Sequence, residues 1–249
     1  MSGHSKWANI KHKKAATDKV KGRVFSKIAK EIMVAARSGG GDPSANITLR
    51  ALVQKARAAN MPADNITRAI KKGTGELEGA VMEEIIYEGY APGGVAMVVQ
   101  SLSDNRNRTA SEVRFAFTKF GSNLAGAGSV MRSFHRRGLF VAAADTVSED
   151  RLLEVALEAG ADDVSREGDV FEVLCEPAQF GALSDALAAA KIKTESAEIT
   201  MIPDTYMPVT DKGVASTLMK FVEALEDLDD VQNVYTNADI PDDMLESIS

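Results

Sequence analysis

The segment DVSREGDVFEVLC, residues 163–175, contains two short runs of strand-forming residues on either side of the turn Glu167-Gly168-Asp169. This pattern predicts a β-hairpin. Before the hairpin we expect a strand over 139–143 and a helix over 148–159, and after it a helix over 178–190 and a strand over 195–202. The resulting order, β-α-β-β-α-β, predicts a ferredoxin-like unit, an antiparallel sheet with both helices on one face.

A second, divided set of elements flanks this unit. Two strands, over 84–90 and 94–102, and a helix over 109–120 leave a sheet unfinished. A helix over 214–226 and a strand over 231–236 can complete it. The sequence therefore predicts an α+β fold in which a ferredoxin-like α/β sandwich domain, residues 134–204, is inserted into a middle ferredoxin-like domain, residues 79–133 plus 205–249.

Residues 1–78 are expected to form an N-terminal three-helix domain. Apolar residues from Val20 to Met33 recur at helical spacing, and Gly39-Gly40-Gly41 ends this helix. Asp42 and Pro43 fit the N-cap and the first turn of a second helix. A short third helix follows Met61-Pro62.

The charge is divided between the two ends of the chain. Its 249 residues include 29 Lys and Arg and 36 Asp and Glu, for a formal charge of −7. From Met1 to Gly75 there are 16 Lys or Arg and 4 Asp or Glu, a net +12, whereas the residues from Glu76 to Ser249 carry −19. A basic end on an acidic body predicts an anionic partner contacted by that end alone. The alternative is that these cations form a solvated face.

The sequence predicts a cytoplasmic protein that does not contact a membrane. It has no apolar stretch near the roughly 18 residues of a membrane span. The first thirty residues lack the apolar block of a secretory signal. A single cysteine rules out a disulfide framework and fits a reducing compartment.

Catalytic chemistry is hard to assemble from these residues. His4, His12 and His135 are scattered and lack the spacing of a zinc site. Cys175 ends an expected strand and is interpreted as a buried structural thiol. Gly73-Thr74-Gly75 lacks the lysine of a phosphate-binding loop and is interpreted as a helix stop. We therefore expect no enzyme activity, no metal, no cofactor and no small-molecule substrate.

Nucleic-acid chemistry assembles more readily in the basic end, because lysine and arginine in number bind phosphate backbones. Trp7, the only tryptophan, can stack on an exposed base. Alternatively, Trp7 anchors the N-terminal arm to the helices, and the sequence supports both equally. The candidate nucleic-acid-binding residues here are Lys6, Trp7, Lys11, His12, Lys13, Lys14, Lys19, Lys21 and Arg23.

A second candidate cluster is the segment Asp104-Asn105-Arg106-Asn107-Arg108-Thr109, which opens a helix. Free N–H groups at a helix start, beside Arg106 and Arg108, suit an anion. The alternative is that Asp104 or Thr109 caps the helix while the arginines pair with local carboxylates. The same ambiguity holds for Arg132, Arg136 and Arg137, while Lys71 and Lys72 also suit the helix dipole.

Five segments together resemble the YebC/PmpR family. They are Gly3 to Ile10, Gly39 to Pro43, Asn60-Met61-Pro62, Tyr87 to Gly94 and Asp104 to Thr109. The resemblance implies three domains, one helical and two ferredoxin-like, with the last inserted into the middle one. It also implies a DNA-binding transcriptional regulator, or a ribosome-associated translation factor such as the mitochondrial translational activators.

We predict a non-enzymatic, nucleic-acid-binding regulator of transcription. The alternative is a ribosome-bound, RNA-binding factor for translation regulation that contacts ribosomal RNA near the peptidyl-transfer site and relieves stalling at proline-rich sequences. In the basic end, the first helix is the most basic and no compact recognition helix follows a short turn, which mildly favours RNA. A metal-dependent enzyme in the acidic body and a protein-binding adaptor are the remaining alternatives.

Overall fold

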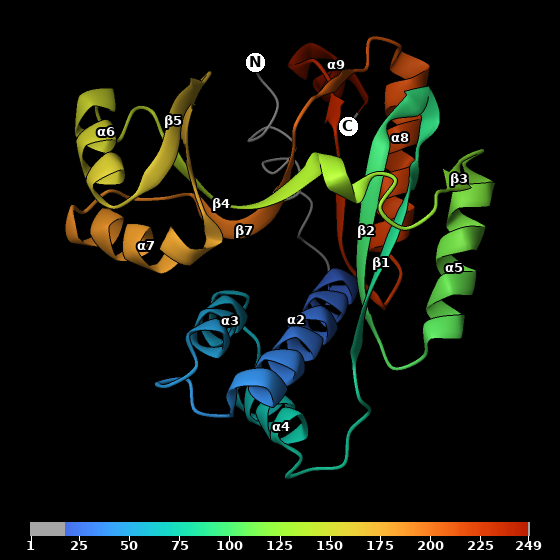
Figure 1. Ribbon diagram of the computed structural model, residues 1–249, viewed down its shortest axis with the longest axis horizontal. Coiled ribbons are helices and arrows are strands. Elements are labelled where there is room, and N and C mark those ends of the chain that lie inside the picture. Colours follow the sequence, from blue (N-terminus) through green and yellow to red (C-terminus); the bar gives the residue numbers. More distant parts are fainter. Residues whose placement is uncertain (1–17, 249) are drawn as a thin grey trace. The chain divides into compact units, whose positions relative to one another are not determined.

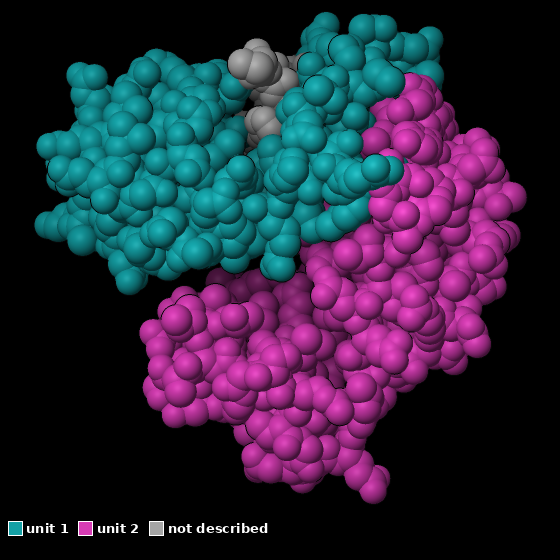
Figure 2. All heavy atoms as spheres, in the orientation of Figure 1, with its two compact units in different colours: residues 1–13, 130–215, 236–249 teal, residues 14–129, 216–235 magenta. Residues whose placement is uncertain are grey.

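The structure is a computed structural model that describes the backbone of residues 18–248 and the side chains of residues 22–241, 243–245, 247 and 248. The described chain divides into two compact units, coloured separately in Figure 2. Unit 2 contains residues up to 129 together with 216–235. Unit 1 contains residues 130–215 and 236–248.

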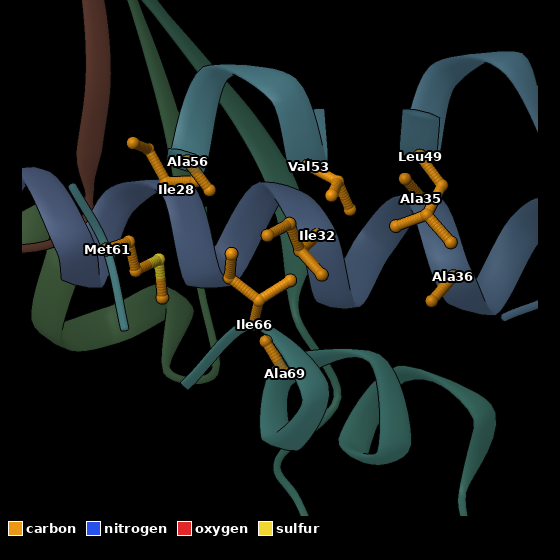
Figure 3. Packing of buried hydrophobic residues seen from close by; sticks show 10 residues of the cluster. All are labelled: Ile28, Ile32, Ala35, Ala36, Leu49, Val53, Ala56, Met61, Ile66 and Ala69. Atoms are coloured by element: carbon orange, nitrogen blue, oxygen red, sulfur yellow. The ribbon is translucent and has the colours of Figure 1, made fainter. Parts of the chain in front are cut away.

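Three helices begin unit 2: α2 (Asp18–Gly39), α3 (Ile47–Ala58) and α4 (Ala63–Thr74). Their buried apolar side chains meet in one core, in which α2 contributes one face to both shorter helices (Figure 3). Each helix is amphipathic, so burial of these faces supplies the stability that helices of 12 residues lack in isolation. The core residues are Ile28, Ile32, Ala35, Ala36, Leu49, Val53, Ala56, Met61, Ile66 and Ala69.

The start of α3 differs from the expectation. The N-cap is Asn46, whose side-chain oxygen accepts a hydrogen bond from Leu49 N at 3.0 Å, and not Asp42. Asp42 instead closes a turn with Ser44, through bonds of 2.8 Å to its N–H and 2.7 Å to its hydroxyl. Asn46 is the N-cap because its amide also donates to Ala35 O near the end of α2, a tertiary contact that Asp42 does not make.

The sheet of unit 2 has the strand order β3-β1-β2-β9. Helices α5 and α8 cover one of its faces (Figure 1). There Phe221 of α8 meets Phe117 of α5 edge to face, with 4.9 Å between the ring centroids. Gly89 of β1 permits this packing, because a Cβ there would lie 2.3 Å from Phe117 Cε1. The elements are β1 (Glu83–Tyr90), β2 (Ala96–Ser103), β3 (Asn123–Leu124), β9 (Val231–Thr236), α5 (Arg106–Lys119) and α8 (Lys212–Glu226).

The sheet of unit 1 has the order β5-β6-β4-β7, with every neighbouring pair antiparallel. The side chains of Phe140, Phe171 and Val173 share one face and pack against both helices of this unit. This confirms the ferredoxin-like arrangement expected from the β-α-β-β-α-β order (Figure 1). The elements are β4 (Phe134–Ala143), α6 (Glu149–Glu158), β5 (Ala161–Glu167), β6 (Val170–Cys175), α7 (Phe180–Ala189) and β7 (Ser196–Pro203).

Several short elements complete the described chain. A two-residue parallel pair joins β8 (Met207–Pro208) to β10 (Ala238–Asp239), and α9 (Asp242–Ile248) follows. Three short 3-10 helices are η1 (Pro92–Gly94), η2 (Met131–Ser133) and η3 (Pro177–Gln179). The predicted α+β class, with a helical part before two sheets, is confirmed. Within the described residues, no helix has the length and apolar character needed to cross a membrane.

Candidate nucleic-acid interface

An acidic turn between α8 and β9 receives cations from α2. Arg23 pairs with the carboxylate of Asp227, and Lys27 Nζ donates to Glu226 O at 2.8 Å. Lys30 Nζ donates to Asp229 O at 2.8 Å and to Asp230 Oδ1 at 2.7 Å. These three cations recur every three or four residues, so one face of α2 reaches the turn. The turn thus ties the helical segment to the sheet of unit 2.

Asp230 is the centre of this contact and is 2% exposed. Its Oδ2 accepts from Arg108 Nη2 at 2.7 Å, Thr109 Oγ1 at 2.8 Å and Ser103 Oγ at 2.9 Å. Burial alone would raise the pKa of Asp230, but the hydrogen bonds from Lys30, Arg108, Thr109 and Ser103 hold the pKa well below its ordinary value. The carboxylate is therefore a buried, fully engaged anion.

Arg108 is engaged on the protein side of this cluster. Its guanidinium donates to Asp230 and also to Asp104 Oδ1 at 2.8 Å, and these hydrogen bonds raise the pKa of Arg108. The start of α5 is capped by Asn105, whose side chain accepts from Arg108 N at 3.1 Å. The alternative that Asp104 or Thr109 caps the helix is therefore wrong. The other part of that alternative, the pairing of an arginine with local carboxylates, is confirmed for Arg108.

Arg106 differs from Arg108 although both open α5. Its side chain is exposed and forms no ion pair or hydrogen bond with the residues that the structure describes. The structure therefore does not bring the two arginines together in one anion site. Binding of nucleic acid by Arg106 and by Arg108 stays a prediction for each.

The helical segment holds a further set of cations. Between Gly22 and Gly75 there are ten Lys or Arg and three Asp or Glu. Arg23, Lys27 and Lys30 contact the acidic turn, Lys55 pairs with Glu31, and Arg50 bonds to two backbone oxygens. The other five have no ion pair or side-chain hydrogen bond within the described chain. We call them the open cations: Arg37, Arg57, Arg68, Lys71 and Lys72.

The sequence predicted nucleic-acid binding by this segment but did not single out all five open cations. Lys71 and Lys72 do lie in the last turn of α4, where the helix dipole favours cations. Arg68 lies one turn earlier and was not singled out. The signal that could have found it is its spacing from Lys71 and Lys72, three and four residues along one helix.

Most of the predicted arm falls beyond the structural description. Lys6, Trp7, Lys11, His12, Lys13 and Lys14 lie outside the described residues. Lys19 and Lys21 lie on α2, but their side chains are also outside the description. The prediction that these residues bind nucleic acid therefore stays a prediction.

The candidates in unit 1 have local partners. Arg137 pairs with Asp162 and Glu176, and His135 Nε2 lies 2.7 Å from Asp204 Oδ1. Cys175 is fully buried, as the sequence predicted, and burial raises the pKa of its thiol. Among the described residues, no three His, Cys, Asp or Glu side chains are grouped so that they could hold a metal ion.

Comparison with known proteins places this architecture in one family. Residues 5–76 match the TACO1/YebC protein N-terminal domain, and residues 82–238 match the TACO1/YebC second and third domain. The chain belongs to the TACO1/YebC family.

Relatives and a solved structure match along the chain. A probable transcriptional regulatory protein of Geobacter sulfurreducens is 55% identical over 248 residues, and one of Desulforapulum autotrophicum is 52% identical over 248, each covering 100% of both chains. The crystal structure of a conserved hypothetical protein from Aquifex aeolicus matches with a TM-score of 0.84 at 48% identity. That match covers 94% of this chain and 97% of the other.

Proposed function

We propose that this protein is a non-enzymatic, nucleic-acid-binding regulator of gene expression that acts in the cytoplasm, with DNA as its target. The relatives carry names of probable transcriptional regulators, which supports a regulatory role. The contact surface would belong to the basic helical domain, residues 1–78. Apart from the arginines at the start of α5, the acidic remainder of the chain would be repelled by phosphate and stay away from it.

The observation that carries the proposal is the set of open cations, Arg37, Arg57, Arg68, Lys71 and Lys72. Within the described chain their charges are not neutralised by carboxylates, unlike those of the cations that face the acidic turn. Positive charge without a partner in the protein is available to phosphates, and its binding releases the counterions of the nucleic acid. These five cations are therefore available to phosphates without breaking any ion pair of the described chain.

The connection between α3 and α4 bears on the choice between DNA and RNA. Four residues, 59–62, separate two helices of 12 residues each. Three to four residues is the connection length found in helix-turn-helix units, which supports DNA as the target. DNA is accordingly the leading target.

Co-sedimentation with ribosomes, in the presence of excess promoter DNA at matched salt, tests the proposal. We expect the full-length protein to leave the ribosome pellet as DNA is added. Persistent ribosome binding in excess DNA would instead decide for a translation factor on ribosomal RNA. Binding to neither would overturn nucleic-acid binding itself.

A charge-neutralised variant shows which surface is used. Changing the five open cations to glutamine should lower DNA affinity and reduce the slope of log Kobs against log salt by about one for each lost phosphate contact. A matched control changes to glutamine five cations of the acidic body that have no ion pair or side-chain hydrogen bond within the described chain: Arg114, Lys191, Lys193, Lys212 and Lys220. Equal losses in the two variants would show that net charge, and not the helical surface, drives binding.

A further inference from the structure

A groove runs along the helical segment between α2 and α4. It has a volume of about 310 Å³, near the lower limit of the range found for ligand pockets, about 300–1,000 Å³. Both its walls belong to unit 2, and neither the acidic turn nor the start of α5 contributes to it. The lining residues are Gly22, Phe25, Ser26, Ala29, Met33, Met61, Asn65, Arg68, Ala69 and Lys72.

The length of the groove corresponds to several helical turns. On α2 the lining runs from Gly22 to Met33, which at 1.5 Å per residue spans about 16 Å, or about three turns. At one end α2 and α4 approach closely, since a Cβ on Gly73 would lie 2.5 Å from Met33 O. The groove is therefore bounded where the two helices meet and follows them from there.

The interior of the groove is apolar and adaptable. Ala29 and Ala69 are small and leave room for an occupant, while Phe25, Met33 and Met61 supply larger apolar side chains. Methionine is flexible and polarisable, and it is common on surfaces that accept apolar side chains of varied shape. Phe25 is the one aromatic ring in this lining, so the groove offers little stacking surface for successive bases.

The α4 edge of the groove is positively charged. Arg68 and Lys72 lie one turn apart on α4 and are both open cations, without an ion pair in the described chain. Asn65 continues the same edge one turn earlier and can donate a hydrogen bond. An occupant with apolar side chains toward the groove and carboxylates toward α4 would satisfy both the interior and this edge.

We propose that the groove is a docking site for an acidic amphipathic helix of a partner protein, about three turns long. Such helices place apolar side chains at positions i, i+3 or i+4, and i+7 into a groove between two helices. Carboxylates beside this stripe pair with Arg68 and Lys72. The site goes beyond the proposed nucleic-acid function, because it would connect the regulator to another protein through two of the same open cations, Arg68 and Lys72.

The test uses the full-length protein and two synthetic helical peptides of about 15 residues. Both carry leucine at the groove-facing positions; one has glutamate beside the stripe and its twin has lysine. Binding is followed by fluorescence anisotropy and by the NMR signals of the methionine methyl groups. We expect the glutamate peptide to bind more tightly than its twin and to shift Met33 and Met61.

Two variants make the result decisive. The pair Arg68→Glu and Lys72→Glu should invert the preference between the peptides by about ten-fold, since two exposed ion pairs are replaced by two repulsions. Ala29→Leu, which fills the groove with a good helix former, should weaken both peptides. Lys71→Glu is the matched control, because Lys71 lies on α4 outside the lining, and it should not invert the preference.

Three outcomes would overturn the proposal. One is the absence of glutamate-peptide binding to the wild type. Another is an unchanged preference in the double charge-reversed variant when its melting temperature equals that of the wild type. The third is a shift of Met33 and Met61 by single-stranded DNA and not by peptide, which would make the groove part of the nucleic-acid surface. Loss of DNA binding alone would leave the docking site intact.

Discussion

Helices α2 and α4 use their cations differently: three of those on α2 are engaged by the fold, whereas the three on α4 are open. Arg23, Lys27 and Lys30 of α2 all reach the acidic turn between α8 and β9. The three on α4 form no ion pair within the described chain. A basic residue is thus engaged or left open according to whether folding brings a carboxylate or carbonyl within reach, and its charge alone does not decide.

The largest effect should come from removing the charge of Asp230, the buried carboxylate that pairs with Lys30 of α2. Asp230→Asn leaves Lys30 and Arg108 facing a neutral group in a buried site, whereas the wild type pairs both. Loss of one partner from a buried ion pair costs about 3–5 kcal/mol of unfolding free energy. Urea unfolding measures the difference from the midpoint and slope of the transition.

Asp229→Asn is the matched control for this substitution. The Asp229 carboxylate is exposed, and its residue contributes a backbone oxygen to Lys30. Its loss should change the unfolding free energy by less than about 0.5 kcal/mol. Equal effects of the two substitutions would mean that the turn stabilises through net charge and not through the buried carboxylate.

Acid should erase the difference between wild type and Asp230→Asn. The pKa of Asp230 is lowered by folding, so its stabilisation is complete above the unfolded pKa, about 3.9, and is lost as the pH falls toward the folded pKa. The difference in unfolding free energy between the two proteins should therefore be constant from about pH 5 to about pH 7, since both values lie above the unfolded pKa. It should narrow below about pH 4. A difference that narrows between about pH 5 and about pH 7 would contradict the assignment.

The sequence predicted the fold well where a local pattern and a turn coincide. The strands Val170–Cys175 and Val231–Thr236 have the expected bounds, because apolar runs meet a turn at their starts. The two-residue strands β3, β8 and β10 were not predicted, since two residues are too few to show a periodic pattern. The prediction placed the N-cap of α3 at Asp42 and not at Asn46, because the hydrogen bond from Asn46 to the end of α2 is a tertiary contact.

The sequence predicted which segment is rich in basic residues, but it did not predict which of those residues form contacts within the protein. The excess of Lys and Arg before Gly75 indicated which end of the chain to examine. Arg108 and Asp230 are 122 residues apart, and no local pattern links them. The division between engaged and open cations therefore requires the tertiary structure.

The N-terminal arm, Gly3 to Lys14, should contribute to affinity for nucleic acid and not to the stability of the described units. Changing Lys11, Lys13 and Lys14 to glutamine should reduce the slope of log Kobs against log salt by about three, or about one for each lysine, whatever the base sequence. Binding titrations at several salt concentrations measure this slope. Full retention of affinity would remove the arm from the nucleic-acid surface.

The smallest and sharpest test compares two arginines that begin the same helix. Arg108→Gln removes hydrogen bonds to the carboxylates of Asp230 and Asp104, so it should lower the unfolding free energy by about 1.5–3 kcal/mol. Arg106→Gln removes an exposed cation with no described partner and should change stability by less than about 0.5 kcal/mol.

The binding effects of this pair should run in the opposite order. Arg106→Gln should lower the salt slope of DNA binding by about one, since its guanidinium is available to a phosphate. Arg108→Gln, measured where the variant is still folded, should lower the slope by less than Arg106→Gln does, because Asp230 and Asp104 already engage the Arg108 guanidinium. If Arg106→Gln destabilises the protein as much as Arg108→Gln, the two arginines share a structural role and the distinction between engaged and open cations fails at α5.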